Sequence, residues 1–383
     1  MPGRESGSLP GPGGGIPRPT NRSQTGVRVM SREVRNVLAR LRWPEEYIRT
    51  LRDIFAPAEI HLADKDDTER VRELLGFCDV AVIDGVLDDS FLAAPNLKWA
   101  HCDQSGIDAY APRRLADSDL IVTSSKGRSG PVLAEHAVFF MLAFCYDVKR
   151  LLRAQSRRVW ADHNQDGLRG LYGRKVCIVG YGATGSHLAR QCRAFGMEIT
   201  AYRRRNIPAD VEGVTMFSLE AGDRLEEAVR GADFTVMCAA LNDDSYHMLG
   251  TDEISAMKPG GVLVNMARAQ LVDDVAMQAA LRSGQLGGAG LDVTDPVEPL
   301  PPWHRLWGQP NLLLTPHVTP QMPDRTARTL DILRENAGRY RRGEPLKFAF
   351  GVEDVFSRGQ RPEYFRGYHR IMATWKWIGE RLA

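Results

Sequence analysis

Two patterns of apolar and polar residues alternate along the chain. Short apolar runs predict buried strands, and stretches with an apolar side chain every three or four positions predict amphipathic helices. Strands that alternate with helices are typical of a parallel sheet. The first series predicts helices at 43–55, 66–77 and 88–92, and strands at 59–62, 79–83, 97–102 and 120–123. We therefore expect a small α/β domain that begins near Val27.

A long apolar stretch leads from this region to a second series of the same kind. Residues 129–152 predict one long helix, which we expect to run between two domains and to be buried by both. The second series predicts strands at 176–179, 197–202, 233–238, 261–265, 287–293 and 311–314, and helices at 184–190, 219–229, 273–283 and 320–341. The last of these helices could return to the first domain.

The segment Lys175–Arg190, KVCIVGYGATGSHLAR, joins an apolar strand to a helix through the spacing G-x-G-x-x-G. In a dinucleotide-binding turn the first glycine, here Gly180, makes the tight turn. The second, Gly182, lets the backbone approach a pyrophosphate, and the third, Gly185, allows the helix to pack closely on the strand. The order of strand, glycines and helix makes this interpretation more specific than the glycines alone.

The residues after the next strand indicate which dinucleotide is bound. NAD-binding folds place an acidic residue about 20 positions past the glycines, where it accepts a hydrogen bond from the ribose 2′-OH. Here Tyr202 is followed by Arg203, Arg204 and Arg205, and no acidic residue occupies this place. An arginine complements a 2′-phosphate instead. We therefore expect NADP(H), with NAD(H) as the alternative.

Composition and net charge indicate which classes of partner to expect. The 383 residues, long enough for two domains, are 43% apolar and 26% charged with a net charge of +2, which gives no reason to expect a nucleic-acid or membrane partner. No stretch is long and apolar enough to predict a membrane-spanning helix. The six cysteines contain no C-x-x-C pair. We expect reduced core thiols in a cytoplasmic protein, with neither a disulfide framework nor a metal site.

The two ends of the chain differ from the rest. Residues 1–26 are rich in Gly, Pro, Ser and Arg, and we expect a disordered leader because they cannot bury enough apolar surface to offset the entropy of ordering. Residues 350–383 are aromatic and basic, which is not typical of disorder. We expect an extra helix there, packed on its own subunit or on a partner. A nucleic-acid-binding arm fits less well because the charges are mixed.

Four further motifs resemble those of the D-isomer-specific 2-hydroxyacid dehydrogenases, a family that includes glyoxylate/hydroxypyruvate reductases, phosphoglycerate dehydrogenases and formate dehydrogenases. The motifs are Ala134-Glu135-His136, Met257–Asp273 (MKPGGVLVNMARAQLVD), Gly290–Pro301 (GLDVTDPVEPLP) and Thr315-Pro316-His317. Together with the glycine turn, the resemblance covers residues 78–345 in the order found in the family.

The resemblance implies an architecture of two Rossmann-like parallel-sheet domains. An NAD(P)-binding domain, here residues 126–318, would be inserted into a discontinuous substrate domain, here residues 27–125 plus 319–349. The active site would lie in the cleft between them and take a small anionic substrate. The family also implies a homodimer, or a higher homo-oligomer, formed through the nucleotide-binding domain. Residues 350–383 would be a C-terminal extension outside the family's pattern.

Three residues match positions that carry the family's chemistry. Arg268 is placed like the arginine that holds the substrate carboxylate and carbonyl, as a planar guanidinium can. His317 is placed like the acid/base, and its pKa near neutrality suits reversible proton transfer. Glu298 is the candidate for the carboxylate that pairs with His317 and favours the imidazolium. The spacing from Asp292 to Glu298 is one residue longer than in the family, so either the loop bulges by one residue or Asp295 takes this role.

Other residues are expected to contact the cofactor. Asp292 resembles the family residue that contacts the nicotinamide carboxamide, and the start of the glycine-turn helix offers backbone N–H groups to the pyrophosphate. The cofactor-binding set is Gly180, Gly182, Ala183, Thr184, Gly185, Arg203, Arg204, Ala240 on the adenosine side, Met266, Asp292 and His317.

The substrate is expected to meet the loop after the strand at 97–102. Backbone N–H groups at Gln104, Ser105 and Gly106 resemble the family's glycine-rich loop that holds the substrate carboxylate, although family members usually have more glycine there. Either Lys126 or Arg128, near the hinge between domains, could hold a second anionic group such as a phosphonate or phosphate. Solvated hinge charges are the alternative interpretation of these two residues.

The sequence thus predicts an oxidoreductase that transfers hydride between a nicotinamide cofactor and a small 2-oxo or 2-hydroxy acid. Two alternatives stay open. One is a specialised oxidoreductase that acts on formate, phosphite or a phosphonate aldehyde. The other is a dinucleotide-sensing, corepressor-like binding protein without catalysis, although such a protein would not need Arg268, a nearby glutamate and His317 together.

Overall fold

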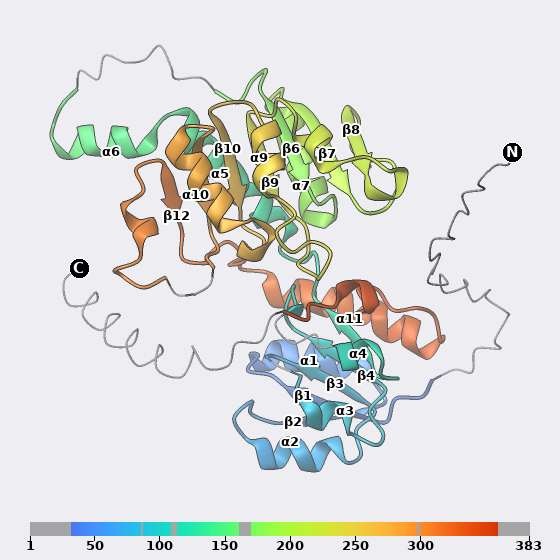
Figure 1. The fold of residues 1–383 in the computed structure, drawn as a ribbon. Coiled ribbons are helices and arrows are strands. Elements are labelled where there is room, and N and C mark those ends of the chain that lie inside the picture. Colours follow the sequence, from blue (N-terminus) through green and yellow to red (C-terminus); the bar gives the residue numbers. More distant parts are fainter. Residues whose placement is uncertain are drawn as a thin grey trace, which may run out of the picture.

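The structure is a computed structural model that describes residues 32–358, apart from 86, 109–112, 161–169, 296–297 and 299. It contains two parallel sheets, each covered by helices, and they lie one above the other in Figure 1. The expected α/β class with two parallel sheets is confirmed. The expected leader, residues 1–26, lies outside the described residues, and so does the greater part of 350–383, where an extra helix is expected.

The first sheet has five strands among the described residues, in the order β2-β1-β3-β4-β5 and all parallel. Its strands are β1 (Asn36–Arg40), β2 (Glu59–Leu62), β3 (Val80–Ile83), β4 (Trp99–Cys102) and β5 (Ile121–Ser124). Its helices are α1 (Glu45–Phe55), α2 (Thr68–Leu75), α3 (Asp89–Leu92) and α4 (Arg113–Ala116).

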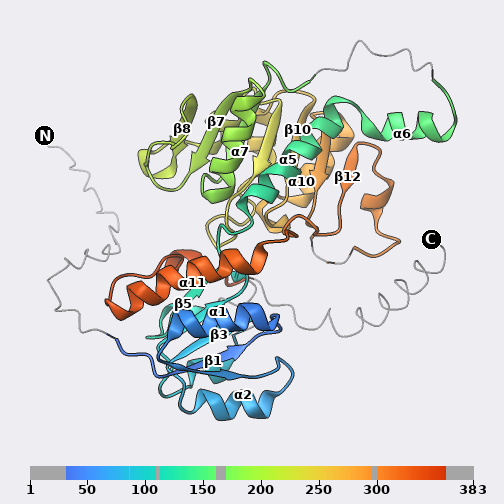
Figure 2. The ribbon, with the colours of Figure 1, turned by 180° about the vertical axis from the view of Figure 1, so that it is seen from behind.

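The last helix, α11 (Arg325–Arg341), returns to this first sheet from the far end of the chain. It packs against α1 (Figure 2), and its apolar side chains Leu330 and Leu333 are buried in one cluster with Leu51 and Trp99. The aromatic ring of Tyr340 also stacks on that of Trp99, with 5.4 Å between the ring centroids. Sequence segments more than 200 residues apart therefore share one core.

The second sheet has seven strands among the described residues, in the order β12-β11-β10-β9-β6-β7-β8 and all parallel. Its strands are β6 (Lys175–Val179), β7 (Glu198–Arg203), β8 (Val214–Ser218), β9 (Phe234–Met237), β10 (Gly261–Asn265), β11 (Leu286–Leu291) and β12 (Leu312–Leu314). Its helices are α7 (Ala183–Ala194), α8 (Leu225–Val229), α9 (Thr251–Ala256) and α10 (Asp274–Ser283).

The apolar stretch predicted as one helix over 129–152 forms two helices, so that prediction is corrected. α5 (Gly130–Cys145) and α6 (Val148–Ser156) are bent by 64°. Asp147 ends the first helix with a left-handed φ of 43°, and its carboxylate then caps the second by accepting a hydrogen bond from the backbone N–H of Arg150. Among the described residues, no single helix is long and apolar enough to span a membrane.

The structure differs from the predicted elements in three further places. The helix expected at 219–229 is divided because Gly222, with a φ of 87°, ends a short 3-10 turn before α8. The sequence did not predict β1, the partly buried strand β8, or α9. Residues 350–358 contain one 3-10 turn (Val352–Asp354) in an otherwise irregular segment and form no helix.

Candidate active site

The turn from β6 to α7 has the geometry that a pyrophosphate site needs. A Cβ at Gly180, whose φ is 99°, would collide with the backbone of Ala239, and a Cβ at Gly185 would lie 2.5 Å from the carbonyl oxygen of Gly180. At Gly182 no heavy atom lies within 4 Å of the Cβ position. The first and third glycines thus permit close packing, whereas the second borders open space at the start of α7.

The exposed start of α7 faces the same open space. Ala183 is its first residue and is exposed, and Thr184 is partly exposed. Their backbone N–H groups belong to the first turn, which has no partners within the helix. This arrangement fits an anion such as a pyrophosphate.

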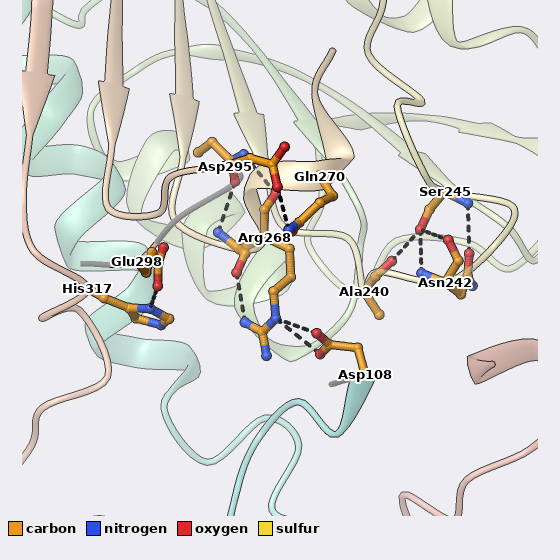
Figure 3. Close-up of polar contacts among 11 residues, drawn as sticks. Asp108, Ala240, Asn242, Ser245, Arg268, Gln270, Asp295, Glu298 and His317 are labelled. Carbon is orange, nitrogen blue, oxygen red and sulfur yellow. Dashed lines mark hydrogen bonds and ion pairs between the residues drawn. The ribbon is translucent and has the colours of Figure 1, made fainter. Parts of the chain in front are cut away.

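The ends of β7 and β9 form the adjoining part of this edge. Arg203 and Arg204 are partly exposed, and the Arg203 guanidinium lies 6.0 Å from the centre of the Tyr181 ring. Ala240 is exposed, and its carbonyl oxygen accepts a hydrogen bond from Ser245 (Figure 3) at 2.8 Å. Because no acidic residue follows β7 directly, the end of this strand presents positive charge.

Arg268 follows β10 after the buried Met266. Its Nε lies 3.0 Å from both carboxylate oxygens of Asp108, and its Nη1 donates to the carbonyl of Ala267 at 2.8 Å (Figure 3). Asn265 Nδ2 donates to the Arg268 carbonyl at 2.9 Å and fixes the backbone. The side chain is 31% exposed, so it is held in place and still reachable.

The loop after β4 touches this guanidinium. The position of a Cβ at Gly106 is taken by the Arg268 guanidinium, so that only a residue without a side chain fits there without displacing it. Ser105 Oγ donates to the carbonyl of Ser125 at 3.3 Å, and Ser105 and Gly106 are both partly exposed. The structure therefore brings Ser105, Gly106 and Arg268 together, although they come from different sheets.

His317 and Glu298 form an ion pair. Nδ1 of His317 lies 2.7 Å from Glu298 Oε2, and Glu298 Oε1 accepts a hydrogen bond from the backbone N–H of Thr294 at 2.8 Å. The hydrogen bond to Glu298 raises the pKa of His317 above its ordinary value, against an opposing effect of burial. Asp295, the alternative partner, accepts a hydrogen bond from Gln270 at 2.7 Å instead. The expected loop bulge falls partly on 296–297, outside the described residues.

Asp292 holds the loop that carries His317, whose φ is 52°. Asp292 Oδ1 accepts hydrogen bonds from the Thr315 hydroxyl at 2.5 Å and from the Val318 N–H at 3.0 Å. Asp292 Oδ2 accepts hydrogen bonds from the Thr319 hydroxyl at 2.5 Å and from the Thr319 N–H at 3.0 Å. His136, on α5, contacts the hydroxyls of both threonines at 3.3 and 2.6 Å. The carboxylate is 1% exposed and fully hydrogen-bonded, which explains how a non-glycine residue stays in the left-handed region.

Arg268 follows β10 and His317 follows β12, both strands of the second sheet, and the Arg268 charge opposes the rise in the pKa of His317. Figure 3 shows both side chains in one close-up, with Glu298 next to the imidazole and Asp108 next to the guanidinium. A guanidinium and an imidazole that is hydrogen-bonded to a carboxylate thus lie at the carboxyl ends of parallel strands, which is where ligands bind in open α/β sheets.

Of the two hinge residues, Arg128 differs from both expectations. Arg128 is 5% exposed and forms an ion pair with Asp103, and its Nη1 donates to Thr329 on α11 at 2.6 Å. It is therefore neither solvated nor open to a substrate anion, because a buried guanidinium needs these partners. Lys126 is half-exposed and lies 3.9 Å from Asp354.

Comparisons with known proteins agree with this geometry. The family described as "D-isomer specific 2-hydroxyacid dehydrogenase, NAD binding domain" matches residues 138–319. A glyoxylate reductase of Korarchaeum cryptofilum is 31% identical over 286 residues, which are 72% of this chain and 82% of the relative. The chain belongs to the D-isomer-specific 2-hydroxyacid dehydrogenase family.

Other members of the family support the assignment across most of the chain. A D-3-phosphoglycerate dehydrogenase of Methanocaldococcus jannaschii is 27% identical over 303 residues, 78% of this chain and 56% of the relative. A D-isomer specific 2-hydroxyacid dehydrogenase of Xanthobacter autotrophicus, solved in complex with NADPH and MES, has a TM-score of 0.69 and 25% identity, and covers 86% of this chain and 100% of its own. As a family member, the chain is an NAD(P)-dependent 2-hydroxyacid oxidoreductase.

The sequence did not indicate one residue of the dehydrogenase site, Asp108. Its partner Arg268 is 160 residues away, and no local pattern joins the two. The available signal was its position two residues after Gly106, in the loop already expected to meet the substrate. An acidic residue in a loop meant to bind an anion needs a cationic partner, and this reasoning could have identified it.

Proposed function

We propose that this dehydrogenase is an NADPH-dependent reductase of a small 2-oxo acid. The observation that carries the proposal is the hydrogen-bonded His317–Glu298 pair beside the Arg268 guanidinium. Reduction of a 2-oxo acid needs a cation for the carboxylate and carbonyl, and a proton for the carbonyl oxygen. Both are available here within one edge of the second sheet.

Arg268 is proposed to bind the substrate carboxylate and to polarise the carbonyl. With Nε bonded to Asp108 and Nη1 bonded to the carbonyl oxygen of Ala267, the guanidinium plane is fixed. Because the guanidinium is already held in place, the side chain loses less conformational entropy when a planar carboxylate binds to it. Backbone N–H groups of Ser105 and Gly106 are proposed to share the same carboxylate.

His317 is proposed to be the acid in reduction and the base in oxidation. The imidazolium donates Nδ1–H to Glu298, which leaves the proton on Nε2 for the carbonyl oxygen of the substrate. Because Glu298 raises the pKa of His317, more of the imidazole carries this proton at neutral pH. Asp292 is proposed to keep the loop in place, and its buried, fully hydrogen-bonded carboxylate does not support the expected contact with the nicotinamide carboxamide.

NADPH, when bound, supplies the hydride. Gly180, Gly182 and Gly185 with the start of α7 are proposed to hold its pyrophosphate, and Arg203 with Arg204 to hold the 2′-phosphate. The positive end of β7 supports NADPH over NADH. The solved Xanthobacter relative, in complex with NADPH, is consistent with this choice. Met266 and Ala240 are proposed to line the nicotinamide and adenosine sides.

We also propose that the two sheets correspond to two functional domains. Residues 27–125 plus 319–349 would bind the substrate, and 126–318 would bind the dinucleotide. The interdomain pair of Asp108 and Arg268 supports a site between them.

The test is a set of initial-rate measurements, with NADPH or NADH for reduction and with NADP+ or NAD+ for oxidation. The substrates are glyoxylate and hydroxypyruvate, phosphonate analogues of 2-oxo acids, and, in the oxidative direction, formate and phosphite. We expect the highest kcat/KM with a small 2-oxo acid and NADPH. Equal or better use of NADH would reject the cofactor choice. Turnover of formate, phosphite or the phosphonates alone would reject the substrate class.

A further inference from the structure

Residues Gly351–Ser357, here called the C-terminal strap, leave the first sheet and cross to the second. Just before the strap, the chain lies antiparallel to β5. Ser124 N–H donates to the Phe348 carbonyl at 3.2 Å, and Phe350 N–H donates to the Val122 carbonyl at 2.7 Å. The start of the strap is therefore fixed to the substrate-side sheet.

The far end of the strap is fixed to the loop after β9. Asp243 is the main anchor, since its N–H donates to the Val355 carbonyl at 2.9 Å and its carboxylate accepts the N–H and hydroxyl of Ser357 at 2.8 to 2.9 Å. Phe356 is 7% exposed and lies in the same buried cluster as Leu241 and Leu249. The strap thus adds an apolar side chain to the core of the second sheet.

The middle of the strap contacts the edge where the dinucleotide is expected. The carbonyl oxygen of Glu353 accepts hydrogen bonds from Arg204 Nη2 at 3.2 Å and from Asn242 Nδ2 at 2.8 Å. Arg204 follows β7 and Asn242 follows β9, and these strands flank β6 and its glycine turn. One carbonyl therefore bridges the two loops that border the adenosine end of a Rossmann site.

We propose that the C-terminal strap forms the outer wall of the adenosine half of the dinucleotide site and orients Arg204 toward a 2′-phosphate. The inference rests on the proposed function, because it requires a dinucleotide at this edge. The Glu353 carbonyl engages one N–H of a rigid guanidinium fork, so the direction of the remaining donors is set before the ligand arrives. The ligand class is a 2′-phosphorylated adenine dinucleotide.

The experiment measures dissociation constants for NADPH and NADH with the full-length protein, by quenching of tryptophan fluorescence. Phe356→Ser removes the apolar anchor of the strap, and Ser357→Ala removes a hydroxyl bonded to Asp243. Leu281→Ala is the matched control, because Leu281 lies in the same buried cluster but on α10. Thermal melting of each variant reports its loss of stability.

We expect Phe356→Ser to raise the dissociation constant of NADPH about tenfold and that of NADH much less. Ser357→Ala should raise the dissociation constant of NADPH about threefold. Leu281→Ala should melt at a lower temperature and bind both dinucleotides as the wild type does. Unchanged NADPH binding in both strap variants, or equal losses for NADPH and NADH, would overturn the strap proposal. If Phe356→Ser does not fold, Ser357→Ala decides. Wild-type protein that binds neither dinucleotide would instead contradict the proposed function.

Discussion

The carboxylate of Asp108 holds Nε of Arg268 with both oxygens at 3.0 Å, across the space between the two sheets. Asp108→Asn keeps the size of the side chain and removes its charge. We expect kcat/KM for the 2-oxo acid to fall about tenfold, or about 1.4 kcal/mol, because the guanidinium loses its orientation. The NADPH dissociation constant should not change. The control is Asp119→Asn, an exposed carboxylate of the same sheet, and equal losses in the two variants would contradict the positioning role.

Arg268→Lys retains the positive charge and removes the planar fork. We expect kcat/KM to fall about 100-fold, equivalent to about 2.7 kcal/mol, since an ammonium cannot bind a carboxylate and a carbonyl in one plane. Steady-state kinetics with NADPH at saturation measures the effect. Arg282→Lys, at an exposed site on α10, is the matched control. Activity near the wild-type level in Arg268→Lys would exclude Arg268 as the substrate anchor.

The pH profile of reduction tests the pairing of His317 with Glu298. Reduction needs the imidazolium, so its rate falls as pH rises through the pKa of His317. The hydrogen bond to Glu298 raises that pKa, and Glu298→Gln should therefore move the alkaline limb to lower pH. The measurement is kcat/KM from pH 5 to pH 10, with Glu69→Gln on the exposed face of α2 as control. An unmoved limb would refute the pairing.

Stability in mild acid should depend on His101. This imidazole is completely buried between the hydroxyls of Thr123 and Ser125, and burial lowers its pKa from 6.5 to about 3. Between these values the unfolded chain binds a proton that the folded chain does not. The free energy of unfolding should fall toward low pH, by about 1.4 kcal/mol per pH unit at the steepest.

Urea unfolding at intervals from pH 5 to pH 7.5 measures this dependence. His101→Asn should be less stable than the wild type at pH 7.5, because it loses hydrogen bonds, and its stability should change less with pH. Parallel pH dependence in the two proteins would show that His101 does not titrate on unfolding.

Much of the fold could be predicted because its strands are short apolar runs between polar turns. The bounds of β2 and β10 were predicted to the residue. The break between α5 and α6 could not be predicted from apolar spacing, because it depends on the left-handed backbone at Asp147. A pattern of apolar residues reports which face is buried and says little about where a helix bends.

The candidate site also contains residues that could be inferred from the sequence and residues that could not. Arg268 and His317 occupy strand ends within motifs, so their positions could be inferred from sequence. Asp108 and the C-terminal strap act through partners distant in the chain, and only the folded geometry joins them. Arg128 was misjudged because its charge suggested solvent, whereas Asp103 and Thr329 bury it.

The left-handed backbone at His317 decides how an inactive form of this enzyme should be made. Valine, isoleucine or threonine at this position would strain the chain, and any fall in turnover would then mix lost chemistry with a distorted loop. Asparagine adopts this conformation readily and has no titratable proton. His317→Asn is therefore the variant for trapping substrate and dinucleotide together in an undistorted ternary complex.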